Sequence, residues 1–575
     1  MVEQAIVVMK LGSSVLRSVD AFPVVAHEIY RHVRQGERVV AVVSALEGRT
    51  NGLLAEARAV AEDPDPHHVA ALLGLGEHQS ALLLALALDR AGLAATRLGP
   101  AELSLTAVGD PLDADPVSLD AAALRSALQE HSVAVVPGFI ALDENGRDVL
   151  LGRGGSDLTA LFIADALGGV PCRLIKDVDG IYEHDPAAGG AAPRRFDAIS
   201  WSDALRVGGR LVQPKAIEFA QARKLGFEVA ALGAARGTRV GAGPTQLAPC
   251  ANQAARLRVA LFGAGTVGYG VYRHLAADPE RFEIVGIAVD DLRKARPADL
   301  PRALLTDDPW ALLQRPADMV VEVLGDDQLA FDVISRALRS GKDVVTANKP
   351  VMANHGPLLE ALSHEHARQL AYSASVGGSL PCVELVRLAA RRGRITGLEG
   401  VLNGTCNFIL DRLAAGDDFG AALADAQRRG FAEADPTQDL SGQDAASKLR
   451  ILVREAFGRE LGPENLSCLG IEGLSAKDVQ AQAELGLMTR VVAACRYQDG
   501  IIEAQIAPRA LGADAALARV RGEWNLLCVE LEDGARILAR GKGAGRWPTA
   551  QAVFADLMDA WRASCTTASG LSVAA

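Results

Sequence analysis

The stretch LRVALFGAGTVGYG, residues 257–270, decides the fold of the second half of the chain. A short apolar strand runs straight into Gly263-Ala264-Gly265-Thr266-Val267-Gly268, and a helix is expected to follow. The first glycine of such a turn permits the tight bend, the second lets the backbone approach a pyrophosphate, and the third lets helix and strand pack closely. Asp290 closes the next predicted strand about twenty residues further on, where this fingerprint places an acid. These features predict a Rossmann dinucleotide-binding domain.

The sequence leaves the choice between the two nicotinamide dinucleotides open. Asp290 suits the ribose 2′-hydroxyl of NAD and would repel a 2′-phosphate. Arg293 and Lys294 follow closely and suit the 2′-phosphate of NADP. We expect NADP or NAD, with a slight preference for NADP.

A second informative stretch is GFAEADPTQDLSGQDAASK, residues 430–448. It places several carboxylates near one lysine, Lys448; they are Glu433, Asp435, Asp439 and Asp444, with Asp425 in the preceding predicted helix. Residues 442–452 are predicted to be helical, so Asp444 and Lys448 share one face. An aspartate and a lysine at this spacing usually form an exposed ion pair. Downstream of a dinucleotide fingerprint, it suits carbonyl reduction, in which a positioned acid protonates the alkoxide as hydride arrives.

Composition limits the class of protein. The 575 residues suffice for about three or four domains. A net charge of −12 without a basic block argues against binding to nucleic acid or a membrane surface. The longest apolar runs, such as residues 81–88, are too short to span a bilayer, and no leader pattern is seen. A cytoplasmic protein is therefore expected.

The eight cysteines and eleven histidines show no metal or disulfide pattern. No two cysteines form a CxxC pair, and no histidines have ligand spacing. Buried free thiols are expected.

The order of elements predicts an α/β fold in two blocks. In the first block, about residues 1–245, strands alternate with helices as in a mostly parallel sheet; they include strands 5–9, 38–43, 133–136 and 173–175 and helices 77–91 and 157–167. Residues 233–253 have little periodicity and are interpreted as a linker.

The second block continues the alternation to about residue 380 and then changes to an α+β pattern. Its expected strands are 257–262, 284–289, 319–323, 343–346, 491–496, 501–506, 526–531 and 535–540; its expected helices are 332–339, 358–365, 382–390, 421–429, 444–455 and 549–561. We expect an N-terminal domain at 1–245, a linker at 246–256, a Rossmann domain at 257–380, a catalytic and dimerisation domain at 381–545, and a C-terminal helix within 546–575 returning to the Rossmann domain.

Several motifs, in one order over residues 257–565, resemble homoserine dehydrogenase closely. They are GAGTVGYG at 263–270, VTANKP at 345–350, SVGG at 375–378, LNGTCNF at 402–408, the segment 430–448, and GAG followed by PTA within 543–550. The resemblance implies NAD(P)-dependent interconversion of L-aspartate 4-semialdehyde and L-homoserine.

The same resemblance implies roles for individual residues. Lys448 corresponds to the catalytic lysine, and Lys349 and Asp444 complete the catalytic group. Substrate-binding residues would be Gly430, Glu433, Asp439, Asp444, Asn403, Gly404 and Thr405, with the acids holding the substrate ammonium. Cofactor-binding residues would be Gly263, Gly265, Thr266, Val267, Gly268, Asp290, Arg293, Leu324, Lys349 and Gly545. Burial lowers a lysine pKa and carboxylates raise it, and the sequence leaves open which effect is larger.

One position departs from the family pattern. Ser373 stands where the family usually has a glutamate that helps to bind a monovalent cation. Hydroxyl and carbonyl oxygens, the latter from Val376 and Gly378, are suitable ligands for a hard cation. We expect a weak site for Na⁺ or K⁺ there.

The first block resembles the amino-acid kinase family over about residues 4–240. GRGGSD at 152–157 precedes a predicted helix, and its backbone amides suit a phosphate, although it lacks the GK[ST] ending of a P-loop. It occurs together with KLGSS at 10–14, VSA at 43–45, GE at 76–77 and KDVDGIY at 176–182. The GRGGSD and GE motifs point to aspartokinase, which implies ATP with Mg²⁺ and L-aspartate as substrates.

By this second resemblance, Lys10 would neutralise charge on the transferred phosphoryl group. Glu77, Arg153 and Asp157 would bind aspartate, and Asp177 and Tyr182 would lie near the nucleotide. The expected kinase site comprises Lys10, Gly12, Ser13, Ser44, Glu77, Arg153, Gly154, Gly155, Ser156, Asp157, Asp177 and Tyr182.

Three departures leave the kinase activity open. KLGSS is shorter than the usual KFGGTS, Ala187 replaces an arginine after Asp185-Pro186, and Arg210 replaces a lysine. Two alternatives remain: a non-catalytic ligand-binding domain attached to a monofunctional dehydrogenase, and a kinase for another amino acid such as glutamate.

About fifteen residues separate the two blocks, too few for the ligand-binding ACT domains that bifunctional aspartokinase–homoserine dehydrogenases usually carry between their halves. We expect threonine inhibition by that route to be weak or absent. The sequence as a whole predicts a bifunctional biosynthetic enzyme on the route to threonine and methionine. We expect it to act on small molecules and to form a homodimer or higher oligomer.

Overall fold

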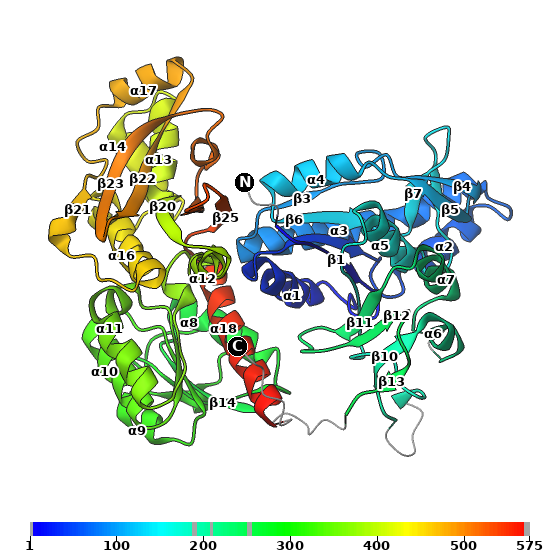
Figure 1. Ribbon diagram of the computed structural model, residues 1–575, viewed down its shortest axis with the longest axis horizontal. Helices are drawn as coiled ribbons and strands as arrows, with labels where there is room; N and C mark the ends of the chain where they lie inside the picture. The colour runs from blue at the N-terminus through cyan, green and yellow to red at the C-terminus, as the bar shows by residue number, and fades with distance from the viewer. Residues whose placement is uncertain (1–3, 187–192, 208–210, 250–255, 569–575) are drawn as a thin grey trace. The chain divides into compact units, whose positions relative to one another are not determined.

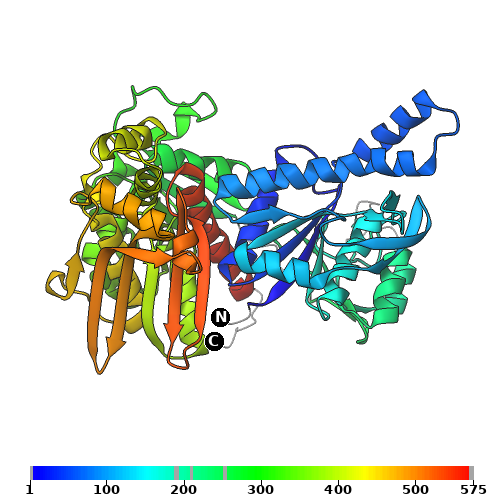
Figure 2. The same cartoon turned by 90° about the horizontal axis from the view of Figure 1, so that it is seen from above.

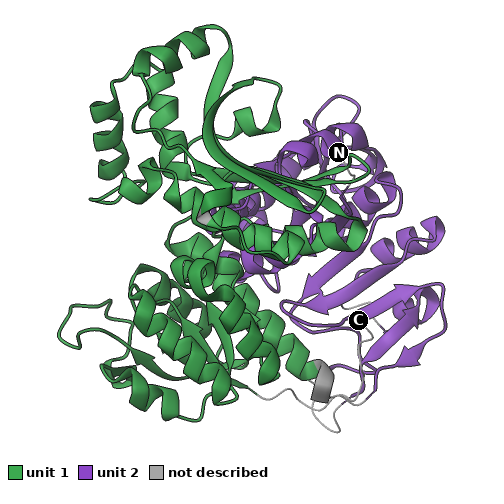
Figure 3. Cartoon of the chain, turned by 60° about the vertical axis from the view of Figure 1, so that its left-hand side comes forward, with its two compact units in different colours: residues 1–3, 253–575 green, residues 4–252 purple. Residues whose placement is uncertain are grey.

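The computed structural model describes residues 4–186, 193–207, 211–249 and 256–568. The chain divides into two compact units, Gln4–Asn252 and Gln253–Ala575, drawn in purple and green in Figure 3. Ala187, Arg210 and Cys250 lie outside the described residues. The other cysteines are free thiols.

The N-terminal unit is built on a nine-stranded sheet of order β13-β10-β12-β11-β9-β1-β2-β6-β3 (Figure 1). Neighbouring strands are parallel except for the pairs β11–β12 and β10–β13. The strands are β1 (Ile6–Leu11), β2 (Arg38–Val43), β3 (Ala95–Arg97), β6 (Val133–Pro137), β9 (Cys172–Lys176), β10 (Phe196–Ser200), β11 (Phe227–Ala231), β12 (Thr238–Gly241) and β13 (Gln246–Leu247). The predicted mostly parallel sheet is confirmed.

Helices cover both sides of this sheet (Figure 2). The apolar runs of β1 and β2 are almost wholly buried, as strands between two helix layers must be. The helices are α1 (Ala21–Arg34), α2 (Arg49–Val60), α3 (Pro66–Ala91), α4 (Ala121–Glu130), α5 (Gly155–Ala166), α6 (Trp201–Val207) and α7 (Pro214–Arg223). A small sheet, order β5-β4-β7-β8, adds β4 (Thr106–Asp110), β5 (Asp113–Ser118), β7 (Ile140–Leu142) and β8 (Asp148–Leu150).

Two predicted boundaries in this unit were wrong. Helix α3 begins at Pro66 rather than at Glu77, because Asp65 accepts hydrogen bonds from the amides of His67 and His68 and caps the helix. The stretch 233–253, interpreted as a linker, contains strands β12 and β13. Both strands are short and lie toward the edge of the sheet, and they are held by backbone pairing together with the buried side chains of Thr238 and Val240.

The C-terminal unit opens with a six-stranded parallel sheet of order β16-β15-β14-β17-β18-β19. Strand β14 (Leu257–Phe262) lies between β15 (Phe282–Ala288) and β17 (Met319–Glu322), so the strand order reverses at the glycine turn. This is the place where doubly wound sheets bind ligands. The remaining elements are β16 (Leu305–Thr306), β18 (Asp343–Thr346), β19 (Leu370–Ala371), α8 (Thr266–Ala276), α9 (Pro309–Gln314), α10 (Asp327–Arg339), α11 (Lys349–Glu365) and the 3₁₀ turns η2 (Arg302–Leu304) and η3 (Ser373–Ser375).

The last helix, α18 (Arg546–Ala568), packs against α8 of the Rossmann domain. Gly270 makes this contact close, because a Cβ there would lie 2.7 Å from the Cβ of Ala550. Helix α18 therefore completes the apolar cluster on one side of the parallel sheet.

Between these parts lies an α+β region with a second six-stranded sheet, order β21-β23-β22-β20-β24-β25. Its strands are β20 (Ile395–Val401), β21 (Leu466–Cys468), β22 (Leu487–Gln498), β23 (Ile501–Gly512), β24 (Trp524–Leu531) and β25 (Arg536–Lys542). Helices α12 (Cys382–Arg392), α13 (Gly404–Ala414) and α16 (Gln443–Phe457) pack against it, accompanied by α14 (Phe419–Arg428), α15 (Thr437–Leu440), α17 (Ala476–Glu484), η4 (Pro463–Asn465) and η5 (Ala516–Arg519).

Strand β20, at the centre of this sheet, was not predicted. Its sequence ITGLEGV contains Gly397 and Gly400, which resemble turn residues. In the fold Gly400 meets the neighbouring backbone closely, since a Cβ there would lie 2.9 Å from the carbonyl oxygen of Leu526. Glycine here serves strand packing rather than a turn.

The chain crosses between the Rossmann domain and the α+β region twice, and the two crossings lie side by side. The amide of Ser379 donates to the carbonyl of Lys542 at 3.2 Å. Gly378 has φ +57°, and a Cβ there would lie 2.8 Å from the same carbonyl oxygen. The outgoing and returning segments are thus held together as one paired connection.

Candidate active site

Two lysines from different parts of the C-terminal unit meet at one carboxylate. Lys349 begins α11 in the Rossmann domain, and its Nζ donates to Oδ1 of Asp444 near the start of α16. Lys448, one turn further along α16, donates from its Nζ to Oδ2 of Asp444 at 2.8 Å and to the carbonyl of Leu402 at 2.7 Å. The side chains of Lys448 and Asp444 are 8% and 10% exposed. Burial alone would raise the pKa of the Asp444 carboxyl, but the two ammonium groups hold it well below its usual range.

A second carboxylate is attached to this group through Asn403. The Nδ2 of Asn403 donates to Asp444 at 2.8 Å and to Asp439 at 2.7 Å, while its Oδ1 accepts from the amide of Cys406 and caps α13. The hydroxyl of Thr405 has acceptors for its one hydrogen in the carbonyl of Phe431 at 2.6 Å and in Asp439 at 3.1 Å. Gly404 is the first residue of the same helix, and a Cβ on Gly404 would lie 3.0 Å from the Glu523 backbone. Asn403 therefore orients both acids.

The other acids of the stretch 430–448 do not join this centre. Glu433 and Asp435 are exposed in the loop that follows Gly430, which has φ +78°. Asp425, grouped with Lys448 in the sequence, pairs instead with Arg428 and Arg429 on its own helix, at 3.2 Å for Arg429. That grouping was wrong because residues three and four apart on α14 pair locally.

The glycine turn has the geometry that close approach of a ligand requires. Gly263 has φ +105°, and a Cβ there would lie 2.6 Å from the carbonyl of Val323. A Cβ on Gly268 would lie 2.1 Å from the carbonyl of Gly263, whereas Gly265 faces open space. Thr266 and Val267 form the first turn of α8, whose amides and dipole favour a phosphate.

The acid beyond the next strand is paired with an arginine that was missed in the sequence. Asp290 is exposed after β15, and the guanidinium of Arg296 donates to its Oδ1 at 3.2 Å and to the carbonyl of Ala264 at 3.1 Å. The Arg296 side chain is 10% exposed, whereas that of Arg293 is 92% exposed and contacts Asp291. Arg296 therefore connects the glycine turn to Asp290.

Glu322, also missed, supports the start of α11 from the end of β17. This fully buried carboxylate accepts from the Thr346 hydroxyl at 2.5 Å and from the amide of Leu324 at 2.7 Å. Burial raises the pKa of Glu322 to about 7. The Thr346 hydroxyl in turn accepts from the Asn348 amide, and Asn348 caps the helix that begins with Lys349. Gly545, with φ +110°, lies just before α18, and a Cβ there would lie 3.6 Å from Cδ of Pro548.

The predicted cation ligands lie where the chain passes from the Rossmann domain to the α+β region. Val376 and Gly378 flank Gly377, which has φ +93°. The Ser373 hydroxyl donates to a carboxylate oxygen of Glu384 on α12. A carboxylate is thus present beside Ser373, but it comes from a different element. Among the described residues no group of three or more His, Cys, Asp or Glu side chains has metal-binding geometry.

In the N-terminal unit two lysines also converge on one carboxylate. Lys10 near the end of β1 and Lys176 at the end of the neighbouring β9 each lie 2.8 Å from Asp157 at the start of α5. All three side chains are buried. Burial, opposed by Asp157 and assisted by Lys176, lowers the pKa of Lys10 to about 8. Lys176 was not predicted, although the sequence places it directly before Asp177.

Glu77 on α3 is near enough to Lys10 for the Lys10 charge to act on its carboxyl group. Its Oε1 accepts from the amide of Ala45, directly after Ser44, at 3.1 Å, and its Oε2 has no partner among the described residues. Gly76 lets α3 approach, since a Cβ there would lie 2.8 Å from that of Ala45. Burial raises the pKa of Glu77 to about 7. Glu77 is therefore a buried acid with one free oxygen.

The remaining predicted kinase residues lie around the carboxyl ends of the parallel strands β1, β2 and β9. A Cβ on Gly12 would lie 3.0 Å from the Lys10 Nζ, and Ser13 is exposed beside it. Gly154 has φ +79° and leads into Gly155 and Ser156 at the start of α5. Arg153 is exposed, Asp177 lies 3.5 Å from Arg17, and the Tyr182 hydroxyl donates to Asp179 at 2.5 Å.

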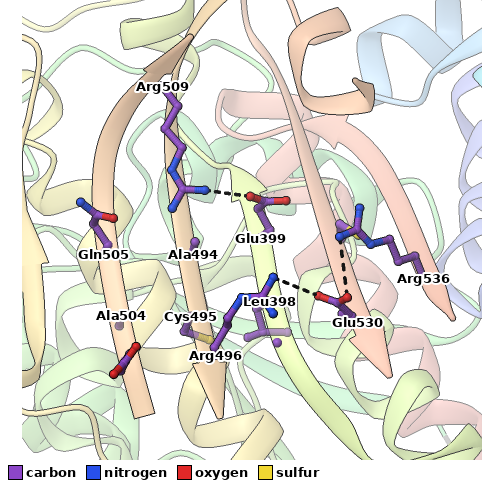
Figure 4. A pocket seen from close by; sticks show the side chains of 13 residues that line it. Leu398, Glu399, Ala494, Cys495, Arg496, Ala504, Gln505, Arg509, Glu530 and Arg536 are labelled. Carbon is purple, nitrogen blue, oxygen red and sulfur yellow. Dashed lines mark hydrogen bonds and ion pairs between the residues drawn. The ribbon is translucent and has the colours of Figure 1, made fainter. Parts of the chain in front are cut away.

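A separate cavity of about 230 Å³ opens on the second sheet of the C-terminal unit (Figure 4). Its charged side chains pair with one another: Arg509 lies 3.0 Å from Glu399, and Arg496 and Arg536 lie near Glu530. Neither Lys349 nor Lys448 lines it. We place the candidate active site at the lysine pair rather than at this cavity.

The Rossmann domain and the lysine pair at Asp444 define a nicotinamide-dependent dehydrogenase, joined to a unit with the sheet and lysine–carboxylate centre of a kinase. Residues 5–228 match the amino acid kinase family, 263–373 the NAD binding domain of homoserine dehydrogenase, and 381–558 homoserine dehydrogenase itself. The chain is 38% identical to a homoserine dehydrogenase of Corynebacterium glutamicum over 321 residues, which are 53% of this chain and 72% of that one. The chain belongs to the homoserine dehydrogenase family.

Two further relatives of the chain are also homoserine dehydrogenases. A Synechocystis homoserine dehydrogenase is 34% identical over 53% of this chain and 73% of its own length. The crystal structure of a homoserine dehydrogenase from Thiobacillus denitrificans superimposes with a TM-score of 0.50 at 36% identity, covering 54% of this chain and 74% of that one. These relatives match about half of this chain.

Proposed function

We propose that the C-terminal unit interconverts L-homoserine and L-aspartate 4-semialdehyde with NAD(P), and that the N-terminal unit phosphorylates L-aspartate with ATP. The observation that carries the first part is the convergence of Lys349 and Lys448 on Asp444 beside the Rossmann domain. A bound nicotinamide supplies the hydride for the carbonyl carbon. The chain's own residues must then bind the amino acid and give a proton to the carbonyl oxygen.

Lys448 is the proton donor in this proposal. An ammonium has three N–H donors, and two of those of Lys448 point to Leu402 and Asp444. The third is available for the substrate oxygen. The ammonium groups of Lys349 and Lys448, held beside the reacting carbonyl, would stabilise the negative charge that develops on the alkoxide oxygen.

The substrate ammonium would be held by two acids, Asp439 and Glu433. Asp439, oriented by Asn403 and Thr405, is partly buried, and Glu433 in the neighbouring loop is exposed and has room to turn toward a ligand. Lys349 would contact both the substrate and the nicotinamide end of the cofactor. We also propose a weak monovalent cation site at the carbonyls of Val376 and Gly378.

We propose NADP as the preferred cofactor. Asp290, which would repel a 2′-phosphate, already pairs with Arg296, and the Nζ of Lys294 lies 3.9 Å from it. With Arg293 nearby, the loop carries more positive than negative charge around the 2′ position. These cations would hold the phosphate through charge-assisted hydrogen bonds.

Replacement of Arg296 tests this preference. We expect Arg296→Ala to raise the KM for NADPH about tenfold or more while changing the KM for NADH little, because only the former carries the 2′-phosphate. Arg293→Ala, which removes a more exposed cation, is the matched comparison and should have the smaller effect. Equal loss with both coenzymes would contradict the assignment.

The kinase proposal rests on the buried Lys10–Asp157–Lys176 group. Phosphoryl transfer needs positive charge on the moving phosphoryl oxygens more than it needs covalent chemistry. Two lysines sharing one carboxylate leave an excess positive charge at the ends of β1 and β9. ATP with Mg²⁺ would lie there, with Gly152–Gly155 and the start of α5 supplying backbone amides.

Glu77 gives the kinase reaction a characteristic pH dependence. Its pKa is raised to about 7 by burial, so the carboxylate that would hold the aspartate ammonium is neutralised as pH falls through 7. We expect the KM for aspartate to rise about tenfold per pH unit below that value. Glu77→Gln should give a high KM that no longer varies between pH 6 and pH 8. A pH-independent KM in the unaltered enzyme would contradict this role.

One experiment distinguishes a bifunctional enzyme from the two alternative functions of the N-terminal unit. The full chain is assayed for NADPH oxidation with aspartate 4-semialdehyde, and for ATP-dependent hydroxamate formation with aspartate and with glutamate. We expect both activities, with aspartate as the kinase substrate. Oxidation without hydroxamate formation would favour a monofunctional dehydrogenase with a non-catalytic kinase-like domain, and a signal only with glutamate would favour another amino-acid kinase. We place the enzyme in the cytoplasm, where its thiols stay reduced.

A further inference from the structure

Helices α11 and α16, which carry the lysine pair of the candidate active site, pack against each other (Figure 1). Lys349 is the first residue of α11, and Asp444 and Lys448 belong to α16. Besides the ion pair of Lys349 with Asp444, a buried arginine of α16, Arg454, joins the two helices further along. No step of the proposed reaction uses this arginine.

Arg454 contacts α11 at two points. Its side chain is 8% exposed. Its Nη1 donates to the backbone carbonyl of Met352 at 3.0 Å, and its Nε donates to a carboxylate oxygen of Glu360 at 3.2 Å. Glu460, just beyond the end of α16, lies 3.4 Å from the same Nη1. The guanidinium is therefore held in one orientation between the two helices.

Helix α11 approaches this guanidinium at Gly356. A Cβ at Gly356 would lie 2.1 Å from Nη2 and 2.3 Å from Cζ of Arg454. Any side chain at position 356 would thus displace the guanidinium. The planar group lies directly against the backbone of α11.

The contact coincides with a weak turn of α11. Pro357 lies inside the helix and has no N–H group, so the carbonyl of Ala353 lacks its usual helical partner. Met352 precedes this gap in the hydrogen-bond ladder, and Glu360 follows it. Arg454 therefore bridges the gap, a task that suits the fixed geometry of guanidinium donors.

The N-terminal side of the gap carries Lys349. Met352 lies about one turn after Lys349, so an arginine that fixes the Met352 carbonyl also fixes the first turn of α11. We infer that Arg454 is a positioning residue, which holds α11 to α16 across Pro357 and thereby keeps the Lys349 ammonium at Asp444. The consequence for turnover rests on the proposed function, in which Lys349 contacts the substrate and the nicotinamide.

A double-mutant cycle tests this inference. We expect Arg454→Met to lower the turnover number for semialdehyde reduction about tenfold. In a Lys349→Met chain the same substitution should cause no further loss, because Arg454 acts through Lys349. An arginine that only stabilises the fold would lower turnover in both backgrounds.

Arg450→Met is the matched control. Arg450 also joins α16 to α11, but it does so through the side chain of Asn354, to which its Nη1 donates at 3.3 Å. It does not bridge the gap at Pro357. We expect its replacement to change turnover little.

Gly356→Ala displaces the guanidinium without removing it. Alanine is a better helix former than glycine, so this variant should stay folded. Its Cβ would nevertheless occupy the place of Nη2. We expect turnover to fall as it does in Arg454→Met.

Hydrogen exchange measures the same contact without reference to catalysis. The amides of residues 351–356 should exchange faster in Arg454→Met and in Gly356→Ala than in the wild-type chain, whereas those of residues 445–453 should not. Unchanged exchange and turnover in both variants would overturn the inference, as would an equal loss of turnover in the two Lys349 backgrounds. Faster exchange with unchanged turnover would confirm that Arg454 holds α11 and would contradict the proposed role of Lys349 instead.

Discussion

Lys448→Ala is expected to lower homoserine dehydrogenase turnover at least about 10²-fold, which corresponds to about 2.7 kcal/mol of transition-state stabilisation. The substitution removes the N–H group that would protonate the alkoxide and leaves Asp444 with Lys349 as its remaining ammonium partner. Binding of NADPH, followed by its fluorescence, should change little, because Lys448 lies on α16 and not in the glycine turn.

Lys448→Arg is the matched control. Arginine keeps the positive charge but cannot release its proton near neutral pH. If proton donation matters, both variants are slow, and if charge alone matters, the arginine variant recovers most of the turnover. Near-normal turnover of a folded Lys448→Ala variant would remove Lys448 from the mechanism.

Lys10→Met should abolish most of the kinase activity, by about 10²- to 10³-fold, while leaving homoserine dehydrogenase turnover unchanged. Methionine fills a similar volume in the buried site but supplies no charge to the transferred phosphoryl group. Lys176 would still neutralise Asp157, so the unit should stay folded. The measurements are ATP-dependent hydroxamate formation, semialdehyde reduction and the melting temperature of the same preparation.

Loss of kinase activity with the dehydrogenase intact would locate the transfer site in the N-terminal unit. Arg17→Met is a useful comparison, since Arg17 is exposed and pairs with Asp177 at 3.5 Å, so the kinase should tolerate its loss better. Equal activities in wild-type and Lys10→Met chains would mean that phosphoryl transfer does not depend on the Lys10 ammonium.

Much of the fold could be predicted from the sequence because its signals are local. The glycine turn, the apolar strand before it and the i, i+4 pair of Asp444 and Lys448 all follow from neighbouring residues. The fold class and the homoserine dehydrogenase family are confirmed. The individual site roles stay predictions.

What the sequence could not supply were contacts between distant elements. Arg296 is an ordinary charged loop residue until the fold places it against Ala264, and Glu322 looks like the end of a buried strand until Thr346 and Leu324 surround it. Lys176 becomes part of a site only because β9 lies beside β1. Strand β20 was missed because glycines indicate turns in isolation and close packing in a sheet.

The hydrogen bond between Ser379 and Lys542 ties together the two segments that connect the Rossmann domain with the α+β region. Two connections that are bonded to each other hold the Rossmann domain and the α+β region together at one place, rather than as two independent tethers. Lys349 lies in the Rossmann domain and Lys448 in the α+β region, so their shared contact with Asp444 joins the two regions at a second place. In the proposed reaction the coenzyme and the proton donor come from the two regions joined in this way, and a substrate bound between them would contact both.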